Sequence, residues 1–361
     1  MPPRLIERTP SAYSYPLLIK NLLKSPLTYY PNREIFYRDR FSMTYTELAR
    51  RISKQANMLT DHGVEPGDVV AVMDWDSHRY LESFFAVPMM GAVLHTVNIR
   101  LSPEQLLYTI NHAEDTVILV NSDFLPLLES VRDQFETVKK IILLTDEDAP
   151  PSTKLDLAGE YEDLLSSASE EFDFPDLDEN TMATTFYTTG TTGLPKGVYY
   201  SQRQIVMHTY GLLSALTTTP GFKVDSSDVY MPLTPMFHVH AWGMPYLFTM
   251  MGTKQVYPGK YEPEVLLKLV VGQQVTFSHC VPTIIHMLVS SPAVKSLDLS
   301  KWKVVIGGSA LPRGLCREAL KHNINLTSAY GMSETCPLLT AAVLKPHMWD
   351  WDLEEQIKIR C

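Results

Sequence analysis

Short apolar runs alternate with amphipathic stretches along the first part of the chain. Residues 68–73, 91–95, 116–120 and 140–144 have the length and composition of buried strands, and residues 77–90 have the periodicity of a helix. Parallel strands need long crossover connections, which are usually helices. The alternation therefore predicts an α/β fold with a mostly parallel sheet and helices on its faces.

A helix start is encoded at residues 102–105, between two of these strands. Ser102 can cap the helix, Pro103 fits its first turn, and the Gln105 side chain can reach back to the Ser102 backbone. We therefore expect a capping box at this position.

The pattern changes over residues 145–180, which are acidic and contain three prolines. This composition predicts a surface connection with one short helix near residues 161–167, dividing the chain into approximate halves, 1–180 and 181–361. The α/β pattern then resumes. Strands are expected at 183–188, 229–232, 275–278 and 303–306, and helices starting near Ser201, Glu262, Pro282 and Pro312.

Size and charge narrow the classes of protein. The chain has 361 residues, which exceeds the roughly 250–300 residues at which one core usually divides, so at least two packed subdomains are expected. The formal net charge is −10 and no block of five or more Lys or Arg occurs. This argues against nucleic acid as a partner, although a small phosphate ligand needs only one well-placed loop.

Cysteine and apolar patterns point to a cytoplasmic protein. The four cysteines include no CxxC pair, which argues against zinc, and we expect them to be reduced thiols. The N-terminus lacks an apolar core of signal-peptide type. The most apolar run, 80–97, is interrupted by Glu82 and His95. We therefore expect a soluble protein with no integral membrane segment.

The strongest local signal is a polar loop at residues 188–197, directly after a predicted strand. Glycines let a backbone approach a ligand, consecutive N–H groups can bind an anion, and Lys196 adds charge. A Walker loop requires Ser or Thr after its GK, whereas Gly197 follows Lys196. The alternative is a solvated polar turn. The candidate phosphate-binding residues are Thr188, Thr189, Gly190, Thr191, Thr192, Gly193 and Lys196.

This loop resembles the phosphate-binding signature of the adenylate-forming (AMP-binding) superfamily, which includes acyl-CoA synthetases, luciferases and nonribosomal-peptide adenylation domains. These enzymes join a carboxylate to the α-phosphate of ATP, release pyrophosphate and pass the acyl group to a thiol. The resemblance implies the large N-terminal domain of these enzymes, with two layered α/β subdomains and a small, incomplete β-barrel.

Two later motifs resemble the same superfamily in the same order. In residues 330–335, the resemblance implies that Tyr330 stacks on adenine, Ser333 contacts the α-phosphate and Glu334 binds Mg²⁺ together with Thr188. A carboxylate is a suitable ligand for Mg²⁺ on chemical grounds. Residues 306–312 resemble the segment that lies along the adenine. The further expected nucleotide-binding residues are Gly307, Gly308, Ser309, Ser328, Ala329 and Gly331.

Residues 235–243 carry the most information on the substrate. They resemble the FHVNAWG segment of medium- and long-chain fatty acyl-CoA synthetases, in which His238, Val239 and Trp242 would border the acyl tunnel. His240 stands where that group commonly has Asn. Residues 72–115 also resemble medium-chain acyl-CoA synthetases.

The resemblance implies a fatty-acid:CoA ligase that uses ATP and Mg²⁺, with CoA as co-substrate. Catalysis would be electrostatic, with Lys196 and Glu334 as the catalytic residues. An enzyme acting on an aryl or other carboxylic acid is an alternative, and a non-catalytic nucleotide-binding module is another. Ala241 and Trp242 argue against an amino-acid substrate. Acyl chain length and oligomeric state stay open, with a homodimer among the arrangements.

The resemblance ends soon after residue 340. The family's ribose-binding Asp, its hinge and its C-terminal lid domain with a catalytic lysine have no counterpart before Cys361. We therefore expect a truncated chain that binds ATP and acyl groups but has low activity. Residues 348–361 have the pattern of an interrupted helix and strand.

Overall fold

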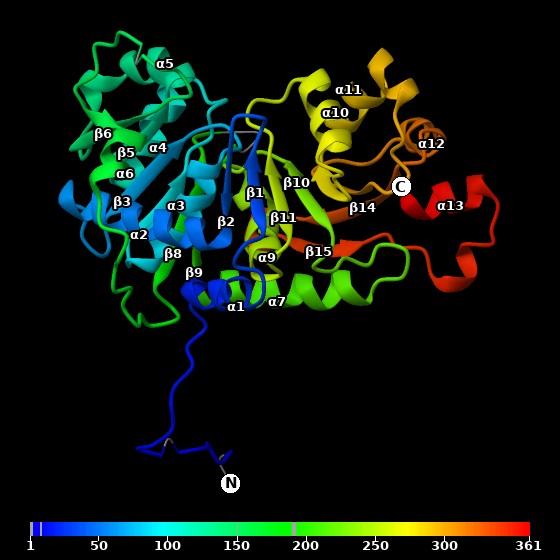
Figure 1. Cartoon of the computed structure of the whole chain (residues 1–361), viewed down its shortest axis with the longest axis horizontal. Coiled ribbons are helices and arrows are strands. Elements are labelled where there is room, and N and C mark those ends of the chain that lie inside the picture. The colour runs from blue at the N-terminus through cyan, green and yellow to red at the C-terminus, as the bar shows by residue number, and fades with distance from the viewer. Residues whose placement is uncertain (1–2, 8, 150, 190–192) are drawn as a thin grey trace.

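Two parallel-rich sheets lie side by side at the centre of the structure (Figure 1), a computed structural model that describes residues 3–7, 9–149, 151–189 and 193–361. One sheet has the strand order β7-β6-β5-β3-β4-β8-β9, and the other has the order β15-β14-β13-β12-β10-β11-β1-β2. All neighbouring pairs are parallel except β1–β2, β8–β9 and β14–β15. This confirms the predicted α/β class.

The strands of the first sheet are β3 (Val69–Met73), β4 (Val93–Thr96), β5 (Asp115–Asn121), β6 (Lys140–Leu144), β7 (Leu157–Glu160), β8 (Met182–Thr188) and β9 (Lys196–Ser201). Those of the second are β1 (Glu34–Tyr37), β2 (Phe41–Thr44), β10 (Val229–Leu233), β11 (Lys254–Tyr257), β12 (Phe277–Cys280), β13 (Lys303–Ile306), β14 (Asn325–Gly331) and β15 (Leu338–Ala341).

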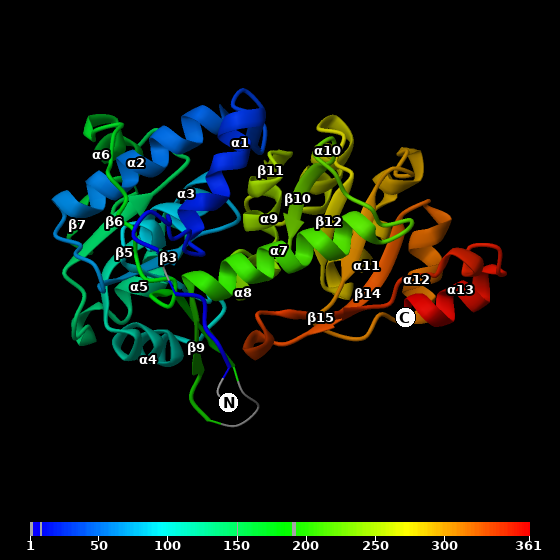
Figure 2. The ribbon, with the colours of Figure 1, turned by 90° about the horizontal axis from the view of Figure 1, so that it is seen from below.

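The helices that cover the sheets are α1 (Lys24–Tyr29), α2 (Tyr45–Asp61), α3 (His78–Met89), α4 (Pro103–Ala113), α5 (Leu125–Glu129), α6 (Tyr161–Ser167), α7 (Gln202–Thr218), α8 (Val239–Trp242), α9 (Met244–Met250), α10 (Pro263–Gly272), α11 (Pro282–Val289), α12 (Arg313–Lys321) and α13 (Leu353–Arg360). Figure 2 shows α7 running from the first sheet towards the second. In the described ranges, no helix has both the length and the apolar character to cross a membrane.

Each sheet contains strands from both of the expected halves of the chain. The strands β8 and β9 follow residue 180 yet complete the first sheet, and β1 and β2 precede it yet complete the second. The acidic connection is also more ordered than expected. It contains the predicted helix α6, and β7 pairs with β6 at the sheet edge. An edge strand has a neighbour on one side only, so its composition can be more polar than that of a central strand.

Only one of the two hydrogen bonds of the predicted capping box at residues 102–105 is formed. Ser102 Oγ accepts the Gln105 N–H at 3.3 Å, whereas the return bond from the Gln105 side chain is not formed in this described segment, so the predicted capping box is half correct.

Two elements differ from the expected bounds. Strand β12 begins two residues later than expected. Residues 353–360 form one helix, α13, in place of the expected interrupted helix and strand. Its Arg360 binds the Leu326 carbonyl of β14 at 2.7 Å.

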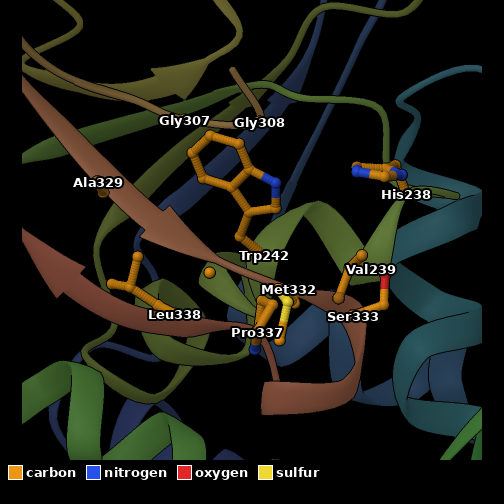
Figure 3. Close-up of a pocket in the computed structure, with 11 residues that line it drawn as sticks. His238, Val239, Trp242, Gly307, Gly308, Ala329, Met332, Ser333, Pro337 and Leu338 are labelled. Carbon is orange, nitrogen blue, oxygen red and sulfur yellow. The ribbon is translucent and has the colours of Figure 1, made fainter. Parts of the chain in front are cut away.

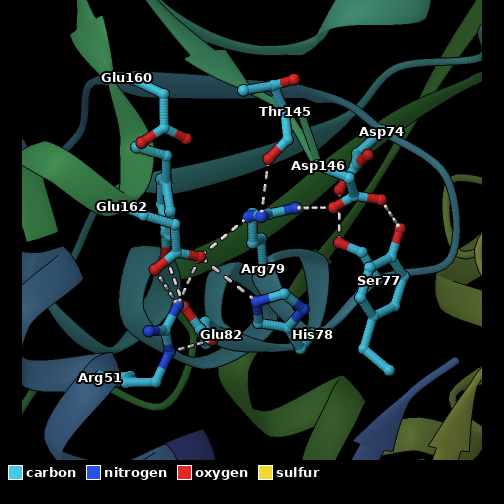
Figure 4. Close-up of polar contacts among 12 residues, drawn as sticks. Arg51, Asp74, Ser77, His78, Arg79, Glu82, Thr145, Asp146, Glu160 and Glu162 are labelled. Atoms are coloured by element: carbon cyan, nitrogen blue, oxygen red, sulfur yellow. Dashed lines mark hydrogen bonds and ion pairs between the residues drawn. The ribbon is translucent and has the colours of Figure 1, made fainter. Parts of the chain in front are cut away.

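An ionic network joins helices α2, α3 and α6 (Figure 4). Arg51 binds Glu82 at 2.7 Å and Glu162 at 2.9 Å, and Arg79 binds Glu162 at 3.0 Å and Asp146 at 2.9 Å. Burial acts to raise the pKa of Glu162, but the hydrogen bond from His78 and the charges of Arg51 and Arg79 hold it below its usual range. The network fixes the helices on this face of the first sheet.

Substituting Arg51 with Met should lower the free energy of unfolding by about 3–5 kcal/mol, because it leaves the fully buried Glu82 carboxylate without its cation. Arg50→Met is the matched control. Arg50 pairs with Glu170 at 3.8 Å on the surface, and its loss should change stability by about 0–1 kcal/mol. Urea denaturation measures both, and equal effects of the two substitutions would contradict this view of the network.

Candidate active site

A cavity of about 190 Å³ lies where three distant segments meet (Figure 3). The segments are residues 238–242, the Gly307–Gly308 turn after β13, and the end of β14 with the chain that follows it. The lining residues are His238, Val239, Trp242, Gly307, Gly308, Ala329, Gly331, Met332, Ser333, Pro337 and Leu338. The turn sits at the carboxyl end of a parallel strand, the usual place for a ligand in an open α/β sheet.

The Trp242 ring forms one wall of this cavity and packs against a strand end without a side chain. A Cβ added at Gly307 would lie 2.8 Å from the indole ring and 3.2 Å from the Ala329 carbonyl oxygen. Figure 3 shows the indole between the Gly307–Gly308 turn and the Met332–Pro337 segment. The ring also packs on His279, with centroids 5.1 Å apart. Gly307 therefore sets how closely Trp242 can approach.

The segment that carries Trp242 has a strained backbone. Val239, His240, Ala241 and Trp242 have φ angles of 49°, 56°, 46° and 57°, and Gly243 follows at 71°. A left-handed conformation costs L-residues roughly 1–2 kcal/mol each, and for a β-branched residue such as Val239 it is an outlier. All four are buried. Such strain persists only where the surroundings hold it, most often at functional sites.

A second cavity of about 410 Å³ adjoins the first and shares Gly308, Ala329 and Gly331 with it. Its remaining lining residues are Ser309, Ala310, Ser328, Tyr330, Thr340, Ala342 and Cys361. The Tyr330 side chain is 57% exposed, so its ring is open to a planar ligand. Of the residues expected from the three later motifs, Glu334 alone lies outside the two described cavities.

The predicted phosphate loop connects β8 with β9, and its described residues line neither cavity. Thr188 pairs with Lys196 at the hairpin end, where Thr189 and Lys196 are exposed and Gly193 has a φ of 106°. Gly190, Thr191 and Thr192 lie outside the described residues. The hydroxyl of Tyr187, just before the loop, bonds His112 Nδ1 of α4 at 2.7 Å. This contact holds the strand that leads into the loop.

A hydrogen bond joins the same hairpin to the Ser333–Thr335 turn. The Tyr200 hydroxyl donates to the Ser333 carbonyl. Tyr200 pairs with Thr184, four residues along β8 from Thr188, which corresponds to about 13 Å. The described structure therefore brings the turn that carries Ser333 and Glu334 to the same hairpin as Thr188.

The side chains of this site could hold Mg²⁺ only together with oxygen atoms of a bound ligand. In the part of the chain that the structure describes, no three His, Cys, Asp or Glu side chains group closely enough to hold a metal. Mg²⁺ usually takes one or two protein carboxylates and completes its shell with phosphate oxygens and water. Glu334 is exposed beside the Ser333 turn, so its carboxylate fits that role.

Two histidines lie at the turn that carries Trp242: His240 is buried and His208 is half-buried. His240 contacts the rings of Phe186 and Tyr200 with centroids 5.3 Å and 5.8 Å away, and His208 lies against Gly243. Within the described residues, neither Nε2 atom has a hydrogen-bond partner. Burial lowers the pKa of His240 to about 3 and that of His208 to about 4. Both imidazoles are therefore neutral at ordinary pH.

Several lining residues were not expected from the sequence. Met332, Pro337 and Leu338 line the first cavity, and Thr340 and Ala342 line the second. They lie on or beside β15, which pairs antiparallel with β14. The apolar residues 338–339 followed by small residues gave a weak strand signal that could have indicated this pairing.

Comparison with known proteins identifies the family of this chain. The sequence pattern of the AMP-binding enzymes matches residues 24–358. The long-chain-fatty-acid–CoA ligase of Thermus thermophilus is 39% identical over 323 residues, 88% of this chain and 57% of that protein. The 3-methylmercaptopropionyl-CoA ligase of Ruegeria pomeroyi is 37% identical over 332 residues, 90% of this chain and 61% of that protein. The chain thus spans about three fifths of the length of these relatives.

The fold agrees with that of adenylate-forming enzymes. The crystal structure of the anthranilate CoA ligase AuaEII in complex with anthranoyl-AMP matches with a TM-score of 0.81 at 20% identity, covering 92% of this chain and 64% of that one. The predicted fold class, the N-terminal domain of adenylate-forming enzymes, is confirmed. The chain belongs to the AMP-binding enzyme family.

Replacing His240 with Asn should change how stability depends on pH. The folded state keeps His240 neutral, while the unfolded chain takes up a proton below about pH 6.5, so stability falls as the pH drops through that value. From about pH 8 to about pH 6, the parent should lose about 0.8 kcal/mol more than His240→Asn. Urea denaturation at the two pH values measures the difference, with His347→Asn as an exposed control. Identical pH slopes in parent and variant would refute the assignment.

Proposed function

We propose that this protein is the nucleotide- and acyl-binding part of a fatty-acid:CoA ligase. The enzyme would convert a medium- or long-chain fatty acid and ATP to acyl-AMP and pyrophosphate, and then form acyl-CoA. The observation that carries the proposal is the convergence of residues 238–242, 307–309 and 328–333 on two adjoining cavities that share a wall. An acyl-adenylate requires two such compartments, because its carbonyl joins an apolar chain to a nucleotide.

The nucleotide would occupy the larger cavity. Tyr330 offers an exposed ring for adenine, and the Gly308 and Gly331 backbones permit close approach of a flat base. The phosphates would reach the loop at 188–197, where N–H groups, hydroxyls and the Lys196 ammonium can bind them. Bound Mg²⁺ would offset phosphate charge, with Glu334 and Thr188 as its protein ligands. These groups act by stabilising the charge that develops in the transition state.

The acyl group would occupy the smaller cavity. Val239, Trp242, Pro337 and Leu338 give it apolar walls, and His238 stands at its edge. Its volume of about 190 Å³ is below the roughly 300–1,000 Å³ common for ligand pockets. A long chain would therefore need displacement of Trp242. The same small volume favours the second candidate function, a ligase for a short or aromatic acid.

Lys196→Ala should weaken ATP binding about 10- to 100-fold, because a charge-assisted hydrogen bond contributes about 1.5–3 kcal/mol. The melting temperature should stay the same, since Lys196 is exposed and carries no core. Titration calorimetry with Mg·ATP measures the affinity, and Lys301→Ala is the control at another exposed lysine. Equal ATP affinity in the parent and in Lys196→Ala would contradict the assignment of this loop to ATP binding. ATP binding without acid-dependent pyrophosphate exchange would indicate a non-catalytic nucleotide-binding module.

Saturated fatty acids of increasing length should stimulate pyrophosphate exchange with rising apparent affinity, since each buried CH₂ contributes about 0.8 kcal/mol. Trp242→Ala should move the length at which the gain stops. Trp351→Ala, at a 39% exposed tryptophan, should leave it unchanged. A flat series, or a preference for benzoates, would favour the aryl-acid alternative.

A further inference from the structure

A buried carboxylate from the first sheet holds the segment that leads into the acyl cavity. Asp76 follows β3 and is 3% exposed. Its Oδ1 accepts the Met236 N–H at 2.8 Å, and its Oδ2 accepts the Tyr261 hydroxyl at 2.5 Å. Its carbonyl oxygen accepts the Gly259 N–H at 2.8 Å. Asp76 thus joins the loop after the central strand of one sheet to the loops after β10 and β11 of the other.

The hydrogen bond between Met236 and Asp76 lies just before the left-handed turn at residues 239–242. Met236 lies three residues before Val239, and two further bonds fix the chain between them. Thr96 Oγ1, at the end of β4, donates to the Phe237 carbonyl at 3.0 Å, and the His238 N–H donates to the Pro235 carbonyl at 2.9 Å. The backbone therefore enters the left-handed turn in a fixed direction. That direction decides where the Val239 and Trp242 side chains point.

A turn of this kind needs an external anchor. Four successive non-glycine residues in the left-handed region are each disfavoured by roughly 1–2 kcal/mol, so a released segment would relax towards ordinary backbone angles. Burial raises the pKa of Asp76 to about 7, and the hydrogen bonds from Tyr261 and Met236 act in the opposite direction. Burying this carboxyl is costly unless its donors are in place, so the contact constrains both partners.

The neighbouring Asp74 provides a comparison within the same loop. It is also buried, but its partners are the Trp75 N–H at 2.8 Å, the Asn121 side chain at 2.7 Å and the Ser77 hydroxyl. All three belong to the first sheet and its connections. The two buried carboxylates thus hold different segments, since Asp76 alone of the pair binds the segment that leads into the acyl cavity.

We propose that Asp76 is a positioning residue for the acyl substrate, because its hydrogen bond to Met236 fixes the turn that carries Val239 and Trp242. The part of this inference that concerns the substrate rests on the proposed function. The part that concerns the turn rests on the contacts of Asp76 alone. Asp76 touches neither cavity, so it acts through the backbone.

Hydrogen exchange of the peptide covering residues 235–243 tests the anchor without reference to activity. Asp76→Ala should speed exchange in this peptide at least about tenfold, because its amides lose their fixed geometry. Asp74→Ala, the matched removal, should leave this peptide unchanged and affect the loop around residue 121. Asp76→Asn keeps an acceptor oxygen for Met236 and should restore most of the protection. Unchanged exchange in Asp76→Ala, or an equal increase in Asp74→Ala, would overturn the proposal.

Tyr261→Phe serves if Asp76→Ala does not fold. It removes one donor to Asp76 and should produce a smaller increase in the same peptide, whereas no increase would overturn the proposal. In pyrophosphate exchange, Asp76→Ala should raise the KM for the acid about tenfold, as expected for one lost charge-assisted bond. The KM for ATP should stay within about twofold. A parent protein that binds neither ATP nor any carboxylic acid would refute the proposed function, and the hydrogen-exchange measurement would still decide the role of Asp76.

Discussion

The close approach of the Trp242 ring to the Gly307 backbone is the contact on which the two cavities depend. A side chain at position 307 would collide with the ring and with the Ala329 carbonyl, so the ring can line the smaller cavity in this position only because glycine stands there. The ring reaches this place through a left-handed turn of four non-glycine residues, which local preference disfavours. The close approach is therefore imposed by the surroundings of the turn: Asp76 and Thr96 hold the chain before it, and His279 packs against the ring it carries.

The topology explains how these surroundings come together. In a parallel sheet all carboxyl ends lie on one edge, and loops at that edge meet without long connections. Here the loop after β3 and the end of β4 in one sheet contact the loop after β10 of the other. The exchange of β1–β2 and β8–β9 between the two halves of the chain ties the sheets together covalently. A site built between them can consequently combine residues from the first hundred positions with residues beyond position 300.

The central parts of this arrangement could be predicted from sequence because they depend on local signals. Strands such as β6 and β13 are buried on both faces and form continuous apolar runs, so their bounds were predicted correctly. The Gly307–Gly308 turn and the residues around Tyr330 were expected at the site because both segments resemble motifs of the AMP-binding superfamily, and the structure places them around the two cavities. The edge strands β7 and β15 were missed, since an edge strand can be polar. The left-handed turn at Val239 and the anchor at Asp76 were missed because both arise from contacts between distant segments, which periodicity does not report.

The two cavities are lined by different kinds of residue. This difference suggests how relatives with different substrates can share one fold. The larger cavity is lined mainly by glycine, serine and alanine, so its shape is set by the backbone. The smaller cavity is shaped by the side chains of His238, Val239, Trp242, Met332 and Leu338. A substitution at one of those positions would alter the space in this cavity without a change in the β13 and β14 backbones. Relatives 37–39% identical to this chain are named for a long-chain fatty acid and for 3-methylmercaptopropionate. If the smaller cavity takes the acid, as proposed, relatives of this chain could differ in substrate through the few side chains around Trp242 and through the contacts that position them.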